Sequence, residues 1–239
     1  DDPSPEASKN YTRLVRRMMS WLTVQTSSGI LFDVDLRLRP NGENGLVVSS
    51  FEMFKRYQRN EDGTGAWPWE HQALTRARFC AGDRAIGQAF EKEREAILRL
   101  LRDKGKVFAD VSEMRARMLE GHPNPTPLFD VKHDRGGMVD VEFAVQAMVL
   151  AYSHEHPELV NNFGNILLLE MAARAGLIGE ELAEKCVSIY RNYRHIQRKH
   201  RLEFGDGPVQ VDRIEQSENI ATVMQLWKTV FGSEGPLRN

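Results

Sequence analysis

From Ser50 to about residue 231, the chain reads as one amphipathic segment after another, and this pattern constrains the fold more than any other feature. Apolar side chains recur every three or four residues, and the breaks are short and polar or glycine-rich. This pattern is typical of a helical bundle, in which each helix buries one stripe. Helices are expected at 9–25, 50–60, 69–79, 83–105, 110–120, 138–152, 162–175, 180–203 and 212–231.

The apolar stripes indicate which faces should be buried. In the first helix, Leu14, Met18, Trp21 and Leu22 share one stripe, so that helix is expected to be half-buried. Prolines end the helical pattern in GHPNPTP, residues 121–127, and a short strand is expected just after it. The other stripes consist of Ile86, Phe90, Ile97 and Leu101; of Met114 and Met118; and of Leu182, Cys186, Ile189, Tyr193 and Ile196.

One stretch has a different period. In FDVDLRLRP, residues 32–40, apolar and charged residues alternate strictly, which predicts a β-strand. The turn-forming NGEN and then LVVSS follow, so two strands are expected within about 29–50. The charged face carries Asp33, Asp35, Arg37 and Arg39. It is either a solvated ladder of ion pairs or one wall of a site for Mg²⁺ and phosphate, and the residues alone favour the ladder.

The composition limits the class of protein. The chain has 239 residues, of which 41% are hydrophobic and 28% charged, so it is long enough for one or two globular domains. With 32 basic and 34 acidic residues, the net charge of −2 provides no general attraction for nucleic acid or membranes. Only two cysteines occur, no apolar run reaches membrane length, and a cytoplasmic location is expected. Because the first residue is Asp, the chain is expected to be part of a longer protein.

Two further motifs each allow two interpretations. In KHDRGGMVDVEF, residues 132–143, the glycine pair with Lys132 and Arg135 could bind an anion, but a capped helix start is favoured. In AWPWEHQALTRAR, residues 66–78, Trp67 and Trp69 could stack on a base, but packing is favoured. Four further histidines do not have the spacing of zinc ligands on a helix and are interpreted as surface or interhelical groups: His154, His156, His195 and His200.

These motifs, taken together and in this order, resemble the glutamine synthetase adenylyltransferase family. The similar blocks are SSGILFDVDLRLRPNGENGLVVSS, YQRNE, WEHQALTRAR and GGMVDVEF, which cover about residues 27–143. The resemblance implies an α+β, mostly α fold, in which a partial nucleotidyltransferase-like α/β unit (1–125) is followed by a helical bundle domain (126–239). The Trp-x-Trp form is similar to the C-terminal, adenylylating half of the family.

The family resemblance also implies a reaction. A tyrosine hydroxyl of glutamine synthetase would attack the α-phosphorus of Mg²⁺-bound ATP, and pyrophosphate would leave. Asp35 would be the catalytic metal ligand, and Asp33 a less certain one. Arg37, Arg39 and Lys132 would bind phosphate, and a P-II-type protein would regulate the enzyme. The family's G-S…D-x-D motif is missing from these residues, so the chain alone is expected to be inactive. The alternatives are a non-catalytic docking module for glutamine synthetase or the regulator, and the AMP-removing, phosphorolytic half.

Overall fold

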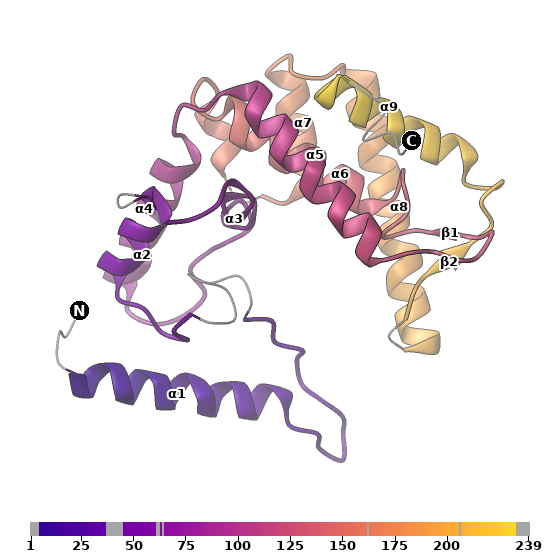
Figure 1. Cartoon of the computed structure of the whole chain (residues 1–239). Helices are drawn as coiled ribbons and strands as arrows, with labels where there is room; N and C mark the ends of the chain where they lie inside the picture. Colours follow the sequence, from indigo (N-terminus) through magenta and orange to yellow (C-terminus); the bar gives the residue numbers. More distant parts are fainter. Residues whose placement is uncertain are drawn as a thin grey trace. The chain divides into compact units, whose positions relative to one another are not determined.

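The computed structural model describes residues 5–36, 45–60, 63, 65–161, 163–205 and 207–232 (Figure 1). The contacts within the chain divide it into two compact units. The first unit runs to Ala73 and also includes Phe79–Ile97; the second consists of Leu74–Arg78 and the chain from Leu98 onward. The domain boundary expected near residue 125 is not tested by this division and stays a prediction.

The described residues of the first unit form four helices, and the last residue of two of them, Leu74 and Leu98, is assigned to the second unit. Phe54 of α2 (Phe51–Arg59) packs on Phe90 of α4 (Arg84–Leu98), with ring centroids 5.5 Å apart. Arg59 donates two hydrogen bonds to the carboxylate of Glu93. Ser50 accepts from the N–H of Met53 and so caps the start of α2. The helices are α1 (Pro5–Thr23), α2 (Phe51–Arg59), α3 (Pro68–Leu74) and α4 (Arg84–Leu98).

Two expectations for the first unit are wrong in the described residues. The stripe of α1 is exposed rather than half-buried, since Trp21 is 62% exposed. Residues 30–36 and 45–50 belong to no strand; Phe32 donates its N–H to the carbonyl of Leu22, and a single bridge joins Thr26 and Gly29. A strand needs a neighbouring strand to satisfy its backbone groups, and alternation alone cannot supply one. The expected turn at 41–44 lies outside the described residues.

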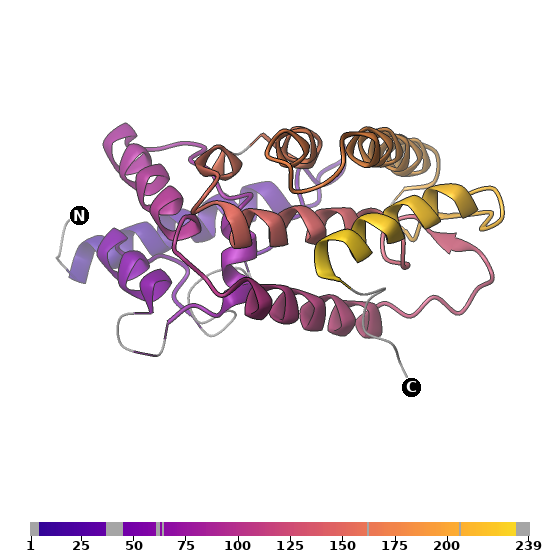
Figure 2. The ribbon, with the colours of Figure 1, turned by 90° about the horizontal axis from the view of Figure 1, so that it is seen from above.

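The second unit is a helical bundle around α6. This helix is buried on nearly every face, because α5, α7, α8 and α9 all pack against it. Figure 2 shows α7 and α8 nearly end-on, with α5, α6 and α9 lying across them. The elements are α5 (Lys104–Gly121), β1 (Phe129–Asp130), α6 (Met138–Tyr152), η2 (Pro157–Val160, a 3-10 helix), α7 (Asn165–Arg174), α8 (Glu180–Phe204), β2 (Gln210–Val211) and α9 (Ser217–Phe231).

The observed elements confirm a mostly α, α+β fold. The seam of α8 is buried at Cys186, Ile189 and Tyr193, and the short strand after the prolines is present as β1, antiparallel to β2. Helix α4 stops at Leu98, so Leu101 lies beyond it and is exposed. Within the described part of the chain, no helix is both long and apolar enough to cross a membrane.

Candidate functional site

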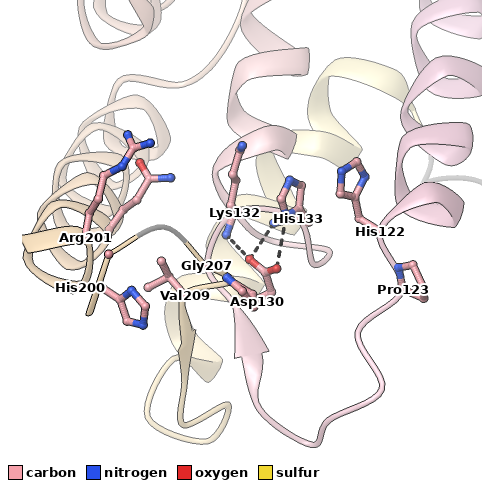
Figure 3. A pocket seen from close by; sticks show the side chains of 12 residues that line it. His122, Pro123, Asp130, Lys132, His133, His200, Arg201, Gly207 and Val209 are labelled. Carbon is pink, nitrogen blue, oxygen red and sulfur yellow. Dashed lines mark hydrogen bonds and ion pairs between the residues drawn. The ribbon is translucent and has the colours of Figure 1, made fainter. Parts of the chain in front are cut away.

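The candidate site is a pocket of about 420 Å³ in the second unit, and it contains Lys132. Figure 3 shows His200 and Arg201 of α8 on one side, His122 at the end of α5 on the other, and the β1–α6 loop between them. The remaining lining residues are Pro123, Asp130, His133, Gln197, Gly205, Gly207, Pro208 and Val209. The charged lining groups are mainly cationic, so an anion fits this pocket better than a cation.

Asp130 organises the loop that carries Lys132. Its Oδ1 accepts hydrogen bonds from the N–H groups of Lys132 and His133 at 2.8 and 3.1 Å, and its Oδ2 lies 3.2 Å from Nδ1 of His133. The main chain of β1 is held in turn by antiparallel pairing with β2. The carboxylate is therefore occupied by the loop itself, and the amine of Lys132 remains the exposed charged group of this turn.

A second buried carboxylate, that of Asp134, also holds this loop in place. Oδ2 of Asp134 accepts from the N–H of Asp130 at 3.0 Å, from Nδ2 of Asn124 at 2.9 Å and from Nη2 of Arg213 at 2.6 Å. Asn124 also accepts from the side chain of Gln210 in β2. The proline-containing loop, β1 and the segment after β2 are thus joined through one side chain.

A buried ion pair connects this loop to the bundle. Nε of Arg115 on α5 donates to Oδ1 of Asp140 in the first turn of α6 at 2.6 Å, and both side chains are at most 1% exposed. Nη2 of Arg115 also donates to the carbonyl of His133 at 2.7 Å. Charged partners in a dry interior are strongly coupled, so this pair fixes the loop relative to α5 and α6.

The glycine pair forms a helix start and not an anion cradle, as the favoured interpretation predicted. The N–H of Gly136 donates to Oδ2 of Asp140, and the N–H of Gly137 donates to the carbonyl of Asp134. Gly136 has φ +85°, and a Cβ on Gly137 would lie 2.7 Å from the carbonyl oxygen of Val131. These backbone donors are already used, so the anion-binding alternative for the glycine pair is wrong.

His133 contributes a neutral ring to the pocket wall. Its ring stacks on that of His122, with centroids 4.2 Å apart and an angle of 9° between the planes. Burial lowers the pKa of His133, and the nearby charges of Lys132 and His122 act in the same direction, whereas the hydrogen bond to Asp130 opposes them. The permanent positive charge of the lining therefore comes from Lys132 and Arg201.

The other predicted site residues lie in the first unit. Asp33 and Asp35 are both exposed, and Arg37 and Arg39 lie outside the described residues. Lys132 belongs to the second unit, whereas Asp33 and Asp35 belong to the first. Among the described residues, no three His, Cys, Asp or Glu side chains converge as a metal site.

The other residues singled out in the sequence are either exposed on the surface or hydrogen-bonded within the fold. Trp67 is 66% exposed, so the expectation that it packs in the interior is wrong. His71, from the same motif, is buried with Nε2 3.0 Å from the carbonyl of Gln58. Glu142 accepts from the hydroxyl of Tyr190 at 2.7 Å and so points away from Asp140, as expected from their angular separation on the helix.

Sequence reasoning missed the ion pair of Arg115 and the role of Asp130 and Asp134. Arg115 occupies a helix position that also fits a charged surface face, and it is recognised as buried only once α5 and α6 are packed. Asp130 is the last residue of the two-residue strand β1, and Asp134 lies in the loop after it, so no periodic pattern marks either carboxylate. A signal was present only for Asp140, because an acidic residue in a first helical turn is favoured by the helix dipole.

Fold and pocket together define a mostly helical α+β protein whose bundle carries a basic pocket. The family model described as glutamate-ammonia ligase adenylyltransferase matches residues 2–93. The chain is 50% identical over 233 residues, or 98% of its length, to the bifunctional glutamine synthetase adenylyltransferase/adenylyl-removing enzyme of Aromatoleum aromaticum. The enzymes of the same name from Burkholderia mallei and Ralstonia nicotianae are 49% and 51% identical over 98% of the chain.

The chain therefore belongs to the glutamate-ammonia ligase adenylyltransferase family. It spans about a quarter of the length of the curated relatives that it matches.

Proposed function

We propose that this chain is part of an enzyme that transfers AMP from ATP to a tyrosine of glutamine synthetase. The observation that carries the proposal is the identity of about one half, over nearly the whole chain, to enzymes named for adenylylation of glutamine synthetase. By resemblance, we assign the chain to the C-terminal, adenylylating half. The AMP-removing half is the alternative within the same family.

Asp35 is the proposed catalytic residue, with Asp33 beside it. Mg²⁺ prefers oxygen ligands and commonly takes only one or two carboxylates, with water and substrate phosphates in its other positions. Two exposed carboxylates two residues apart fit this requirement in kind, and Asp35 and Asp33 would hold the ion. When bound, Mg²⁺ would supply a positive charge that stabilises phosphate oxygens. The protein's own contribution would be to orient the phosphates through Arg37 and Arg39, whose planar donors match phosphate oxygens.

Lys132 is the proposed phosphate ligand of the second unit. Its amine is exposed on a turn that Asp130, Asp134 and Arg115 hold rigid, so little side-chain freedom beyond that of the lysine itself is lost on binding. Glutamine synthetase, ATP and a P-II-type regulator are the proposed partners, and the cytoplasm is the proposed location.

The test of Asp35 is its replacement by Asn in the full-length enzyme. AMP transfer to glutamine synthetase, measured as a mass increase of the substrate protein, should fall below detection while the circular dichroism spectrum is unchanged. Glu113→Gln is the control, because Glu113 is an exposed acid in an ion pair on α5. Transfer retained by Asp35→Asn would return Asp35 to the role of a surface ion-pair former.

The test of Lys132 is a kinetic one in the same full-length enzyme. Lys132→Gln should raise the KM for ATP about tenfold, since one charge-assisted hydrogen bond is worth about 1.5–3 kcal/mol. Lys185→Gln, which removes an exposed lysine of α8 outside the pocket, should leave the KM unchanged. Equal KM values for both variants would contradict the assignment of Lys132.

A docking role is the second candidate function, and the self-contained core of the second unit favours it. Residues of α6, α7, α8 and α9 form one apolar cluster within that unit. We expect the 239-residue chain to bind glutamine synthetase without transferring AMP, because the family's G-S…D-x-D motif is missing from it. Calorimetry with purified glutamine synthetase tests the binding, and robust transfer by the chain alone would refute the expectation of inactivity.

A further inference from the structure

A second pocket of about 430 Å³ lies in the second unit, at the start of α7 and against one face of α8. Its basic lining groups are four arginines and a histidine. Arg191, Arg194, His195 and Arg198 follow each other at helical spacing and form one stripe along α8. Arg76 completes the set, and the other lining residues are Phe163, Gly164, Asn165, Ile166 and Tyr190.

The stripe carries positive charge that the described residues do not neutralise. Arg191 and Arg198 are exposed and form no ion pair or hydrogen bond within the part of the chain that the structure describes. Nε of Arg194 is buried and has no hydrogen-bond partner there. Like charges three to four residues apart destabilise a helix, and a buried donor without a partner is unfavourable. An anion in the pocket relieves the repulsion between these like charges.

Hydrogen bonds between polar side chains hold the base of the pocket in place. Nη1 of Arg76 donates to Oδ1 of Asn165 at 3.2 Å, and Nδ2 of Asn165 donates to the hydroxyl of Tyr190 at 2.9 Å. The Tyr190 hydroxyl in turn donates to Glu142. Asn165 and Tyr190 are at most 3% exposed, so the base of the pocket is rigid. Glu142 is engaged by Tyr190 and does not line the pocket.

The shape and donors of the pocket select the anion. Guanidinium groups present paired N–H donors that match phosphate oxygens, and four of them require a ligand with several negative charges. Gly164 and Asn165 line the pocket, so the N-terminus of the ten-residue helix α7 lies in its wall. The positive end of the helix dipole adds to the positive charge of the arginines. The volume is within the range of small-molecule sites and is sufficient for a chain of two or three phosphates.

We propose that this pocket binds an anion with two or three linked phosphate groups. The phosphate chain contacts Arg191, Arg194 and Arg198. The ring of Phe163, which is 56% exposed in the pocket wall, is available to stack on the base of a nucleotide. The site is separate from the pocket of Lys132, and its existence is independent of the proposed AMP transfer.

Calorimetric titration of the 239-residue chain with inorganic tripolyphosphate at physiological salt tests the site. Arg191→Gln together with Arg198→Gln should weaken binding about 100-fold, at about tenfold for each charge-assisted contact. Lys199→Gln removes the same charge from an exposed neighbour on α8 that does not line the pocket, and should change the affinity less than twofold. Circular dichroism confirms that each variant is folded.

The outcomes separate specific binding from general attraction. Equal weakening by Lys199→Gln, citrate binding as tight as tripolyphosphate, or no effect of the double substitution would overturn the proposal. ATP as a second probe identifies the source of the phosphates. Binding tighter than tripolyphosphate that falls to the tripolyphosphate level in Phe163→Leu supports a nucleotide, and equal binding of both probes supports an inorganic polyphosphate. Loss of AMP transfer by Asp35→Asn leaves all these affinities unchanged.

Discussion

Replacing Asp140 by Asn should strongly destabilise the second unit. The carboxylate is fully buried, pairs with Nε of Arg115 at 2.6 Å and accepts the N–H of Gly136 at 2.6 Å. The amide has nearly the same volume but no charge, so Arg115 stays buried without a counterion. Breaking a buried pair from one side costs about 3–5 kcal/mol, against about 5–15 kcal/mol for the stability of a typical domain. The midpoint of thermal unfolding should fall by roughly 6–20 °C.

Urea unfolding followed by far-UV circular dichroism and tryptophan fluorescence measures this loss. Trp227, fully buried in α9, reports on the second unit. Glu113→Gln is the matched control, because Glu113 and Arg117 form an ion pair on the same helix α5 whose side chains are 62% and 66% exposed. An exposed pair of this kind is worth at most about 0.5 kcal/mol. Similar losses in the two variants would refute the argument that burial makes the Arg115–Asp140 pair decisive.

Three further predictions concern individual side chains. Burial lowers the pKa of His133 below the ordinary histidine value of 6.5. As the pH falls through about 6.5, His133 therefore takes up a proton in the unfolded chain before it does so in the folded chain, and the folded state loses stability. NMR titration should show that His133 in the folded chain titrates below the ordinary histidine value. Gly137→Ala should cost roughly 1–3 kcal/mol because its Cβ would meet the carbonyl of Val131, whereas Gly121→Ala, in open space at the end of α5, should be neutral or slightly stabilising in the same unfolding assay. Burial raises the pKa of Cys186 to about 12, so a disulfide reagent at pH 8 should titrate the exposed Cys80 in the native chain and both thiols after denaturation.

Local patterns predicted most of the helices. The bounds expected for α6 agree with the structure, and those for α8 differ by one residue. Apolar residues recur at the helical period in both helices, a glycine precedes α6, and glycines stand at both ends of α8. The prolines after Gly121 correctly predicted the end of α5. The same reasoning failed for residues 32–36, where a strictly alternating sequence forms no strand in this chain.

The sequence by itself determined the class of fold, the helix order and the family, because these depend on periodicity and on motifs that are local in the chain. Only the tertiary structure decided which charges are buried. Arg115 and Asp140 are 25 residues apart, and Arg76 reaches Asn165 across 89 residues. The tertiary structure also decided that the arginine stripe of α8 faces a pocket. Charged residues at helical spacing are equally typical of a helix face exposed to solvent, so the sequence alone could not distinguish the two. Burial and proximity depend on how helices pack, and no local pattern encodes the partner that a side chain meets after folding.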